Sequence, residues 1–204
     1  MKVKICGITN SPDALTAEKL GADAIGFIFY EGSKRFIQPE KAKEISKLLS
    51  PFTVKVGVFV NDTAKKINEI LKIAGINAAQ LHGEESPEFV KEINLPVIKS
   101  FRINDTFDYS VLNSYRNCSI LLDSFDRNKY GGTGKNFNWQ GIPPKIKSII
   151  ILSGGISERN IELIYNKIKP AAVDISSSVE VSPGKKDLIK LEHFFNKLNK
   201  LRSR

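Results

Sequence analysis

Residues 149–155 read Ile-Ile-Ile-Leu-Ser-Gly-Gly, an apolar run that ends in a serine and two glycines. A strand that is apolar at every position is buried on both faces, which is typical of a parallel sheet covered by helices. Similar short runs, rich in β-branched residues, recur along the chain. The sequence therefore predicts eight strands, over residues 2–5, 24–29, 54–60, 78–81, 97–101, 119–122, 149–152 and 172–175.

Amphipathic stretches separate these strands, and several begin with residues that favour a helix start. Ser11 and Ser86 each precede a proline and an acidic residue, an order that suits the first turn of a helix. Asp62 and Ser157 are the predicted caps of two further helices. Predicted helices cover residues 63–73, 158–168 and 186–201. The alternation of strands and helices indicates a parallel sheet with crossover helices.

The length of the chain fits one closed barrel. Divided among eight units, 204 residues leave about 25 for each strand with its helix, which is compact for this fold. A doubly wound open sheet usually has fewer strands, and no G-x-G-x-x-G sequence follows a predicted strand. We predict an α/β protein with a single domain over residues 1–204, a (β/α)8 TIM barrel with a closed parallel sheet of eight strands.

Composition limits the classes of protein that fit. Hydrophobic residues make up 41% of the chain and charged residues 26%, which is ordinary for a globular protein. The net charge is +9, but the basic residues are spread along the chain and are not interleaved with aromatics. No apolar run has the roughly 20 residues that span a bilayer. With two cysteines and no apolar leader at the start, we expect a cytoplasmic protein with reduced thiols that binds neither nucleic acid nor membrane.

In a barrel of this type, functional residues lie at the carboxyl ends of the strands and in the loops that follow. Those positions bring together Cys6, Arg35, His82 and Asp123, which are far apart in sequence. A cysteine thiolate can act as a base, and a carboxyl group ending an apolar strand can act as an acid. An arginine can hold a carboxylate through two parallel hydrogen bonds. We predict an acid–base site, with Arg35 across the barrel mouth from the loops after the last two strands.

The loops after the last two strands have the composition of an anion site. Gly154 and Gly155 let backbone N–H groups approach an anion, and a helix beginning near Ser157 would add its positive end. Barrels of this kind usually bind phosphate at this place. The predicted phosphate-binding residues are Gly154, Gly155, Asp174, Ser176 and Ser177.

Each candidate also has a structural interpretation. Cys6 could be a small buried hydrophobic residue, Asp123 a structural carboxylate and Arg35 a solvated loop residue. His82 is a candidate substrate contact, although a hydrogen-bonded structural histidine is the simpler interpretation. Cys118 precedes the sixth strand, at the opposite rim, and is predicted to be a core residue. The sequence has no HExxH or CxxC motif, and we expect no metal and no cofactor.

Short motifs along nearly the whole chain occur in the order of one known family. They are KICGIT at residues 4–9, GADAIGF at 21–27, SKRFI at 33–37, VGVFVN at 56–61, QLHGEE at 80–85, LLDS at 121–124, YGGTGK at 130–135, LSGG at 152–155, VDISS at 173–177, VE at 179–180 and PGKKD at 183–187. Each motif alone is weak, but together they are specific. The chain resembles the phosphoribosylanthranilate isomerase family of tryptophan biosynthesis.

The resemblance implies an isomerase that acts on a small phosphosugar without a cofactor, as a monomer or homodimer. The family's reaction is the Amadori rearrangement of N-(5-phosphoribosyl)anthranilate to 1-(2-carboxyphenylamino)-1-deoxyribulose 5-phosphate. By resemblance, Asp123 is the general acid that protonates the ring oxygen, and Cys6 is the general base that removes the C2′ proton. Arg35 is the residue that holds the anthranilate. Two positions depart from the family pattern, because Ser178 replaces a common glycine and Asn138 a common aspartate.

Two other functions stay open on the sequence alone. Another phosphosugar barrel, such as the decarboxylating cyclase that acts next in the same pathway, would be expected to use lysine and glutamate at its strand ends. Cys6 and Asp123 do not fit that chemistry. A basic, non-catalytic barrel that binds nucleic acid would retard duplex or single-stranded DNA at physiological salt.

Overall fold

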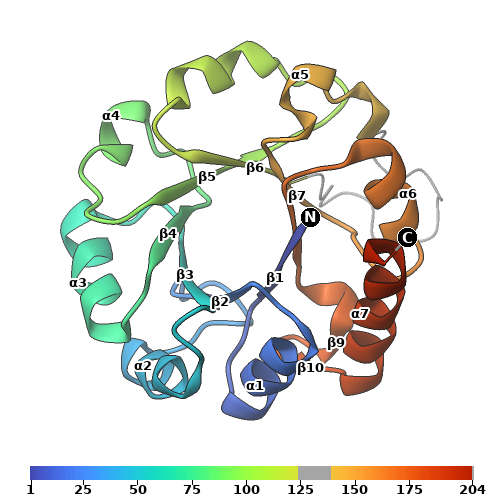
Figure 1. Ribbon diagram of the computed structural model, residues 1–204. Coiled ribbons are helices and arrows are strands. Elements are labelled where there is room, and N and C mark those ends of the chain that lie inside the picture. The colour runs from blue at the N-terminus through green and yellow to red at the C-terminus, as the bar shows by residue number, and fades with distance from the viewer. Residues whose placement is uncertain (124–138, 204) are drawn as a thin grey trace.

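The computed structural model, which describes residues 1–123 and 139–203, contains a closed barrel of parallel strands (Figure 1). The strands follow one another around the barrel in chain order, and β8 pairs with β1 to close it. They are β1 (Lys2–Cys6), β2 (Ala24–Ile28), β3 (Val54–Phe59), β4 (Ala78–Leu81), β5 (Val97–Arg102), β6 (Ser119–Asp123), β7 (Ile151–Ser153) and β8 (Ala172–Ile175). The predicted (β/α)8 fold is confirmed.

Helices surround the strands on the outside of the barrel (Figure 1). The α-helices are α1 (Ser11–Leu20), α2 (Pro39–Leu48), α3 (Ala64–Ala74), α4 (Pro87–Val90), α5 (Pro144–Lys147), α6 (Ile161–Leu163) and α7 (Leu188–Arg202). Shorter segments of 3-10 helix are η1 (Tyr109–Tyr115), η2 (Trp139–Gly141) and η4 (Ser177–Val179), and α6 continues as a π-helical segment, η3 (Ile164–Ile168). A 3-10 segment thus stands between β5 and β6, where the fold usually has a helix.

Two helix caps differ from the prediction by one residue. Asn10, rather than Ser11, caps α1, and Thr63, rather than Asp62, caps α3. In both cases the capping oxygen accepts a hydrogen bond from the backbone N–H three residues later, the usual geometry of an N-cap. Ser86 caps α4 as predicted.

The seventh strand begins later than its apolar sequence predicts. Ile149 is 66% exposed, and its N–H bonds to the carbonyl of Ile146 in the turn that leaves α5. The chain therefore enters the barrel only at Ile151, and β7 extends to Ser153. The four consecutive apolar residues predicted the strand correctly, but they did not show where the preceding turn ends.

A small antiparallel hairpin follows β8 and was not predicted. It consists of β9 (Glu180–Ser182) and β10 (Lys185–Lys186), with Lys186 paired to Glu180. The two strands are too short and too polar to show an alternating pattern. Both Glu180 and Lys186 are nevertheless buried.

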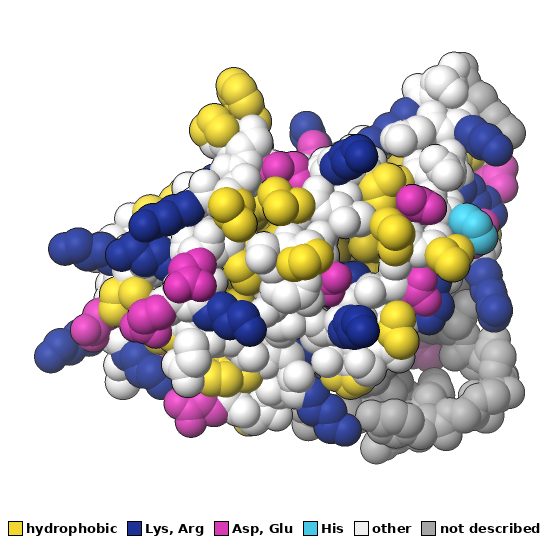
Figure 2. All heavy atoms as spheres, turned by 90° about the horizontal axis from the view of Figure 1, so that it is seen from below, with side chains coloured by type: hydrophobic (Ala, Val, Ile, Leu, Met, Phe, Trp, Pro, Cys, Tyr) yellow, Lys and Arg dark blue, Asp and Glu magenta, His cyan; other side chains and the backbone are white. Residues whose placement is uncertain are grey.

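Charged side chains of both signs cover the surface of the barrel. Figure 2 shows a face on which Lys and Arg lie among Asp, Glu and apolar side chains. Cys118 is half-buried and packs against the core, close to its predicted place. In the described part of the chain, no helix is long and apolar enough to cross a membrane.

Candidate active site

Cys6 ends β1, and its thiol lies over Gly26 of the neighbouring strand β2. A Cβ atom on Gly26 would lie 2.9 Å from the Sγ of Cys6 and 3.0 Å from the Cε of Lys4. Any larger residue would displace one of these side chains, so the glycine makes room for both. Cys6 is only 6% exposed, which places its thiol in a dry environment.

A buried ion pair lies next to this thiol, and its lysine, Lys4, stands two residues before Cys6 on β1. Lys4 Nζ is 3.0 Å from Asp174 Oδ1 of β8, and the two side chains are 4% and 7% exposed. Burial raises the pKa of Cys6, and although Lys4 and Lys186 lower it, the net direction is upward. Burial lowers the pKa of Lys4, but Asp174 and Cys6 together outweigh this and raise it. Lys4 is therefore a cation beside the thiol at neutral pH.

Asp123 ends β6, at the same end of the barrel as Cys6. Its Oδ2 lies 3.4 Å from the Nε2 of His82, and both side chains are partly accessible. The Nε2 of Gln80 lies 3.0 Å from the Nδ1 of His82. With the Gln80 amide nitrogen as donor and Nδ1 as acceptor, a neutral His82 carries its proton on Nε2, the nitrogen near Asp123.

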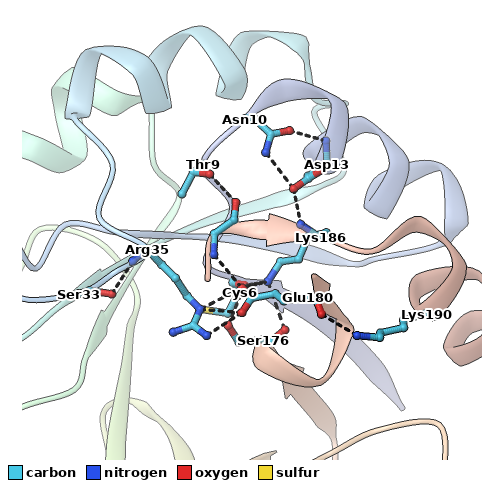
Figure 3. Close-up of polar contacts among 11 residues, drawn as sticks. Cys6, Thr9, Asn10, Asp13, Ser33, Arg35, Ser176, Glu180, Lys186 and Lys190 are labelled. Atoms are coloured by element: carbon cyan, nitrogen blue, oxygen red, sulfur yellow. Dashed lines mark hydrogen bonds and ion pairs between the residues drawn. The ribbon is translucent and has the colours of Figure 1, made fainter. Parts of the chain in front are cut away.

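Arg35 lies beside β8, and the prediction that it faces the last two loops across the barrel mouth is wrong. Its Nε is 2.9 and 3.1 Å from the two carboxylate oxygens of Glu180, and its Nη2 is 2.6 Å from Oε2 (Figure 3). The barrel closes through β1 and β8, so the loop after β2 and the hairpin after β8 both flank β1. Spacing along the chain does not show this closeness.

The loops after β7 and β8 are joined to each other. Gly154 and Gly155 have φ angles of 92° and 65°, in the left-handed region that favours glycine. Ser178 Oγ donates to the carbonyl oxygen of Ile156 at 2.5 Å, which connects the second loop to the first. Ser178 has no positive φ, so a serine is accepted where the family commonly has glycine.

Two predictions about the phosphate site need correction. The helix after β7 begins at Ile161 rather than near Ser157, and residues 158–160 form a turn before it. Asp174 pairs with Lys4 inside the barrel, and a carboxylate would repel a phosphate. Asp174 therefore belongs to the floor of the site, near Cys6, and not to the phosphate loops.

The paired serines of the VDISS motif have different surroundings. Ser176 Oγ donates to the carbonyl oxygen of Cys6 at 3.1 Å, which ties the end of β8 to the end of β1. Ser177 is exposed at the start of η4. The YGGTGK motif and Asn138 lie outside the described residues.

Three residues of the site were not singled out from the sequence. Lys4 is a polar residue in an apolar strand, a signal that could have found it. Glu180 and Lys186 lie in two of the family motifs, but no local pattern indicated that the hairpin would bring them to Arg35. Among the residues that the structure describes, no group of three His, Cys, Asp or Glu side chains could hold a metal ion.

A closed parallel barrel with a thiol, a carboxyl group and glycine-rich loops at the carboxyl ends of its strands defines a class, the (β/α)8-barrel enzymes. The family model of N-(5'phosphoribosyl)anthranilate (PRA) isomerase matches residues 3–197. The N-(5'-phosphoribosyl)anthranilate isomerase of Thermotoga neapolitana is 47% identical over 201 residues, 97% of this chain and 98% of the relative. This chain belongs to the N-(5'-phosphoribosyl)anthranilate isomerase family, and it is an isomerase of tryptophan biosynthesis.

Solved structures agree with this assignment. The crystal structure of phosphoribosyl anthranilate isomerase from Thermotoga maritima has a TM-score of 0.90 and 43% identity, covering 98% of this chain and 99% of that one. A phosphoribosyl anthranilate isomerase in complex with reduced 1-(o-carboxyphenylamino)-1-deoxyribulose 5-phosphate has a TM-score of 0.86 and 41% identity, with the same coverage.

Proposed function

We propose that this isomerase performs the Amadori rearrangement with Cys6 as general base and Asp123 as general acid. The observation that carries the proposal is the order of the strands. Cys6 ends β1 and Asp123 ends β6, and β7 and β8 with their joined loops stand between them. A phosphosugar held at those loops by its phosphate would have its sugar carbons between the thiol and the carboxyl group.

The reaction then begins with two proton transfers by the protein. Asp123 protonates the ring oxygen, the C1′–O bond breaks, and the nitrogen lone pair forms a C1′=N double bond. The Cys6 thiolate removes the C2′ proton, and the electron pair moves through C1′=C2′ to the nitrogen, giving an enolamine. The enolamine then tautomerises to the ketone by gaining a proton at C1′ and losing the C2′ hydroxyl proton. Cys6 gives up the proton that it removed, and Asp123 takes up a proton in place of the one that it gave to the ring oxygen, so both groups return to their starting states.

His82 supports the release of the first proton. Its Nε2 lies 3.4 Å from the carboxyl group that becomes a carboxylate when the ring opens. A hydrogen bond to the charged form stabilises it, and Gln80 keeps the histidine proton on the required nitrogen. We assign His82 to the acid side of the site.

Arg35 holds the anthranilate carboxylate in this proposal. The ligand bound by the relative carries both a carboxyphenyl group and a phosphate, so a site for it has two anions to bind. The joined loops of β7 and β8 suit the phosphate, and the guanidinium of Arg35 suits the carboxylate. The Arg35 side chain is 23% exposed, so a ligand in the barrel mouth can reach it.

An anthranilate-fluorescence assay with freshly generated substrate tests the proposal. We expect turnover by the wild type and by a Cys118→Ser variant, because the Cys118 thiol, which donates to the carbonyl oxygen of Tyr115, lies outside the site. A folded wild-type protein without turnover would contradict the isomerase function. Full turnover by a Cys6→Ser variant would contradict the role of Cys6 as the base. A shift of DNA mobility at physiological salt, with no isomerase activity, would favour the non-catalytic alternative.

A further inference from the structure

The hairpin β9–β10 places two charged side chains in the wall of the site. The Nζ of Lys186 is 2.9 Å from Oε1 of Glu180, and their side chains are 1% and 4% exposed. Burial raises the pKa of Glu180, but the hydrogen bonds from Arg35 and Lys186 outweigh it, and the net direction is downward. A buried ion pair is costly to desolvate, and neither residue has a part in the chemistry above. Their position beside Arg35 and Cys6 suggests another role.

Glu180 fixes the plane of the Arg35 guanidinium. Three N–H···O contacts, of 2.6 to 3.1 Å, join the Nε and Nη2 of Arg35 to both oxygens of Glu180 (Figure 3). A carboxylate that binds one edge of the guanidinium in this way leaves it little freedom to rotate. The aliphatic part of Arg35 passes over Gly7, where a Cβ atom would lie 2.6 Å from its Cδ. The arginine is thus held directly beside the residue that follows Cys6.

The hairpin is anchored independently of Arg35. Thr9 Oγ1 donates to the carbonyl oxygen of Gly184 at 2.5 Å, and the backbone N–H of Lys186 donates to Asp13 at 2.6 Å. Lys190 of α7 donates to the carbonyl oxygen of Glu180 at 2.7 Å. Figure 3 shows these contacts around the hairpin. Glu180 is therefore held in place by the hairpin, and it sets the orientation of the partly exposed Arg35 side chain.

Lys186 connects this anchor to the thiol. Its Nζ donates to the carbonyl oxygen of Cys6 at 2.6 Å, to that of Ser176 at 3.3 Å and to Oε1 of Glu180. An ammonium group has three N–H donors, and all three have acceptors here. The buried ammonium group of Lys186 thus connects the end of β1, the end of β8 and Glu180.

We propose that Glu180 is a positioning residue for the reaction, because it orients Arg35 toward the substrate carboxylate. Lys186 holds Glu180 and the backbone of Cys6 in fixed positions relative to each other. The inference rests on the carboxylate-binding role proposed for Arg35. A merely structural ion pair is the alternative, and the chain contains a suitable control. Lys99 and Glu85 form a second buried pair, with a 3.0 Å separation and 3% exposure of each side chain, in contact with the loop after β4.

The test is the carboxylate preference, defined as the ratio of kcat/KM for the natural substrate to that for the counterpart made from aniline. We expect Glu180→Gln to reduce this preference about tenfold, mainly through a higher KM for the natural substrate, because a mobile guanidinium binds the carboxylate less well. Glu85→Gln removes the same charge from the other pair and should lower stability while leaving the preference unchanged. If Glu180→Gln alone does not fold, the double variant Glu180→Gln/Lys186→Gln, which removes both charges of the pair, should show the same loss of preference.

Arg35→Ala, measured in parallel, separates the inference from the function on which it rests. Loss of the preference in Arg35→Ala but not in the folded Glu180 variants would overturn the positioning role and leave Arg35 as the carboxylate contact. A preference unchanged in Arg35→Ala would overturn both assignments. An equal loss in Glu85→Gln and Glu180→Gln would also overturn the inference, because a general loss of stability would then explain it.

Discussion

The base side and the acid side of this site have different surroundings. Cys6 is 6% exposed and lies among the buried charges of Lys4, Asp174 and Lys186. Asp123 has a side chain that is 15% exposed and faces His82, which is itself 22% exposed. The thiol is thus enclosed by fixed charges, whereas the carboxyl group lies near the barrel mouth, where solvent can exchange protons with it.

The difference shows how one barrel can keep a base and an acid with separate environments. A thiol acts as a base only as its thiolate, which buried cations favour because water does not screen them. Here Lys4 and Lys186 offset part of the effect of burial, which still raises the pKa of Cys6. An acid must regain its proton in each turnover, which is easier close to solvent. The contrast between the two sides leads to four predictions.

Removing the thiol should have the largest effect. Cys6→Ser should lower kcat at least about a hundredfold, because a serine hydroxyl is not ionised near neutral pH and cannot replace the base. The change is measured by steady-state kinetics, with circular dichroism to check the fold. Cys118→Ser is the matched control and should affect stability at most. Turnover close to that of the wild type in folded Cys6→Ser would remove Cys6 from the mechanism.

Removing the acid should have a smaller effect. Asp123→Asn should lower kcat by up to about a hundredfold, because the amide keeps the shape of the side chain but delivers no proton. Some activity should remain, since a glycosylamine ring also opens in water. Full activity in this variant would require a different acid, and Asp174, bound to Lys4, would be the next group to test.

Weakening the carboxylate contact should mainly affect binding. Arg35→Ala should raise KM about tenfold or more, and Arg35→Lys should recover only part of the loss, because lysine offers no planar pair of donors. If Arg35 also aligns the C2′ proton with Cys6, kcat falls as well. An equal preference of wild type and Arg35→Ala for the natural substrate over the aniline counterpart would show that Arg35 does not bind the carboxylate.

Changing the charges around the thiol should have the smallest and most specific effect. Burial raises the pKa of Cys6, so kcat/KM should rise with pH into the alkaline range as the thiolate forms. Because Lys4 lowers this pKa and Asp174 raises it, Lys4→Met should move the rise to higher pH and Asp174→Asn to lower pH. Lys186 faces the same thiol and also lowers its pKa, so it remains unchanged in both variants.

Lys2→Met supplies the control for this pH dependence. Lys2 lies on the same strand as Lys4 but is 74% exposed and pairs with Asp23 at the surface. Its removal should leave the pH profile in place. A shift in Lys2→Met as large as that in Lys4→Met would mean that overall charge, and not the pair beside Cys6, controls the pH dependence.

The sequence predicted the barrel because its strands are short, apolar and regularly spaced. It also predicted that Cys6 and Asp123 lie at the same end, since parallel strands bring their carboxyl ends together. It did not predict where Arg35 points, because that depends on which strand closes the barrel and on a hairpin of a few polar residues. Glu180 and Lys186 were missed for the same reason.

Asp174 shows a second limit of sequence reasoning. Its place near the end of β8, two residues before Ser176, favoured the phosphate loops as its site. The direction of a strand side chain alternates, and the partner of Asp174 is a lysine on β1, which is distant in sequence. Only the register between β1 and β8 shows that this carboxylate lies in the floor of the site.

The separate roles of Cys6 as base and Asp123 as acid are tested most directly by a kinetic isotope effect with substrate deuterated at C2′. Residual turnover is measured in Cys6→Ser and in Asp123→Asn with labelled and unlabelled substrate. If Cys6 removes the C2′ proton and Asp123 opens the ring, Cys6→Ser should show a large isotope effect, because proton abstraction limits its rate. Asp123→Asn should show an effect close to unity, because ring opening limits it. A large effect in Asp123→Asn together with none in Cys6→Ser would contradict the assignment of base and acid.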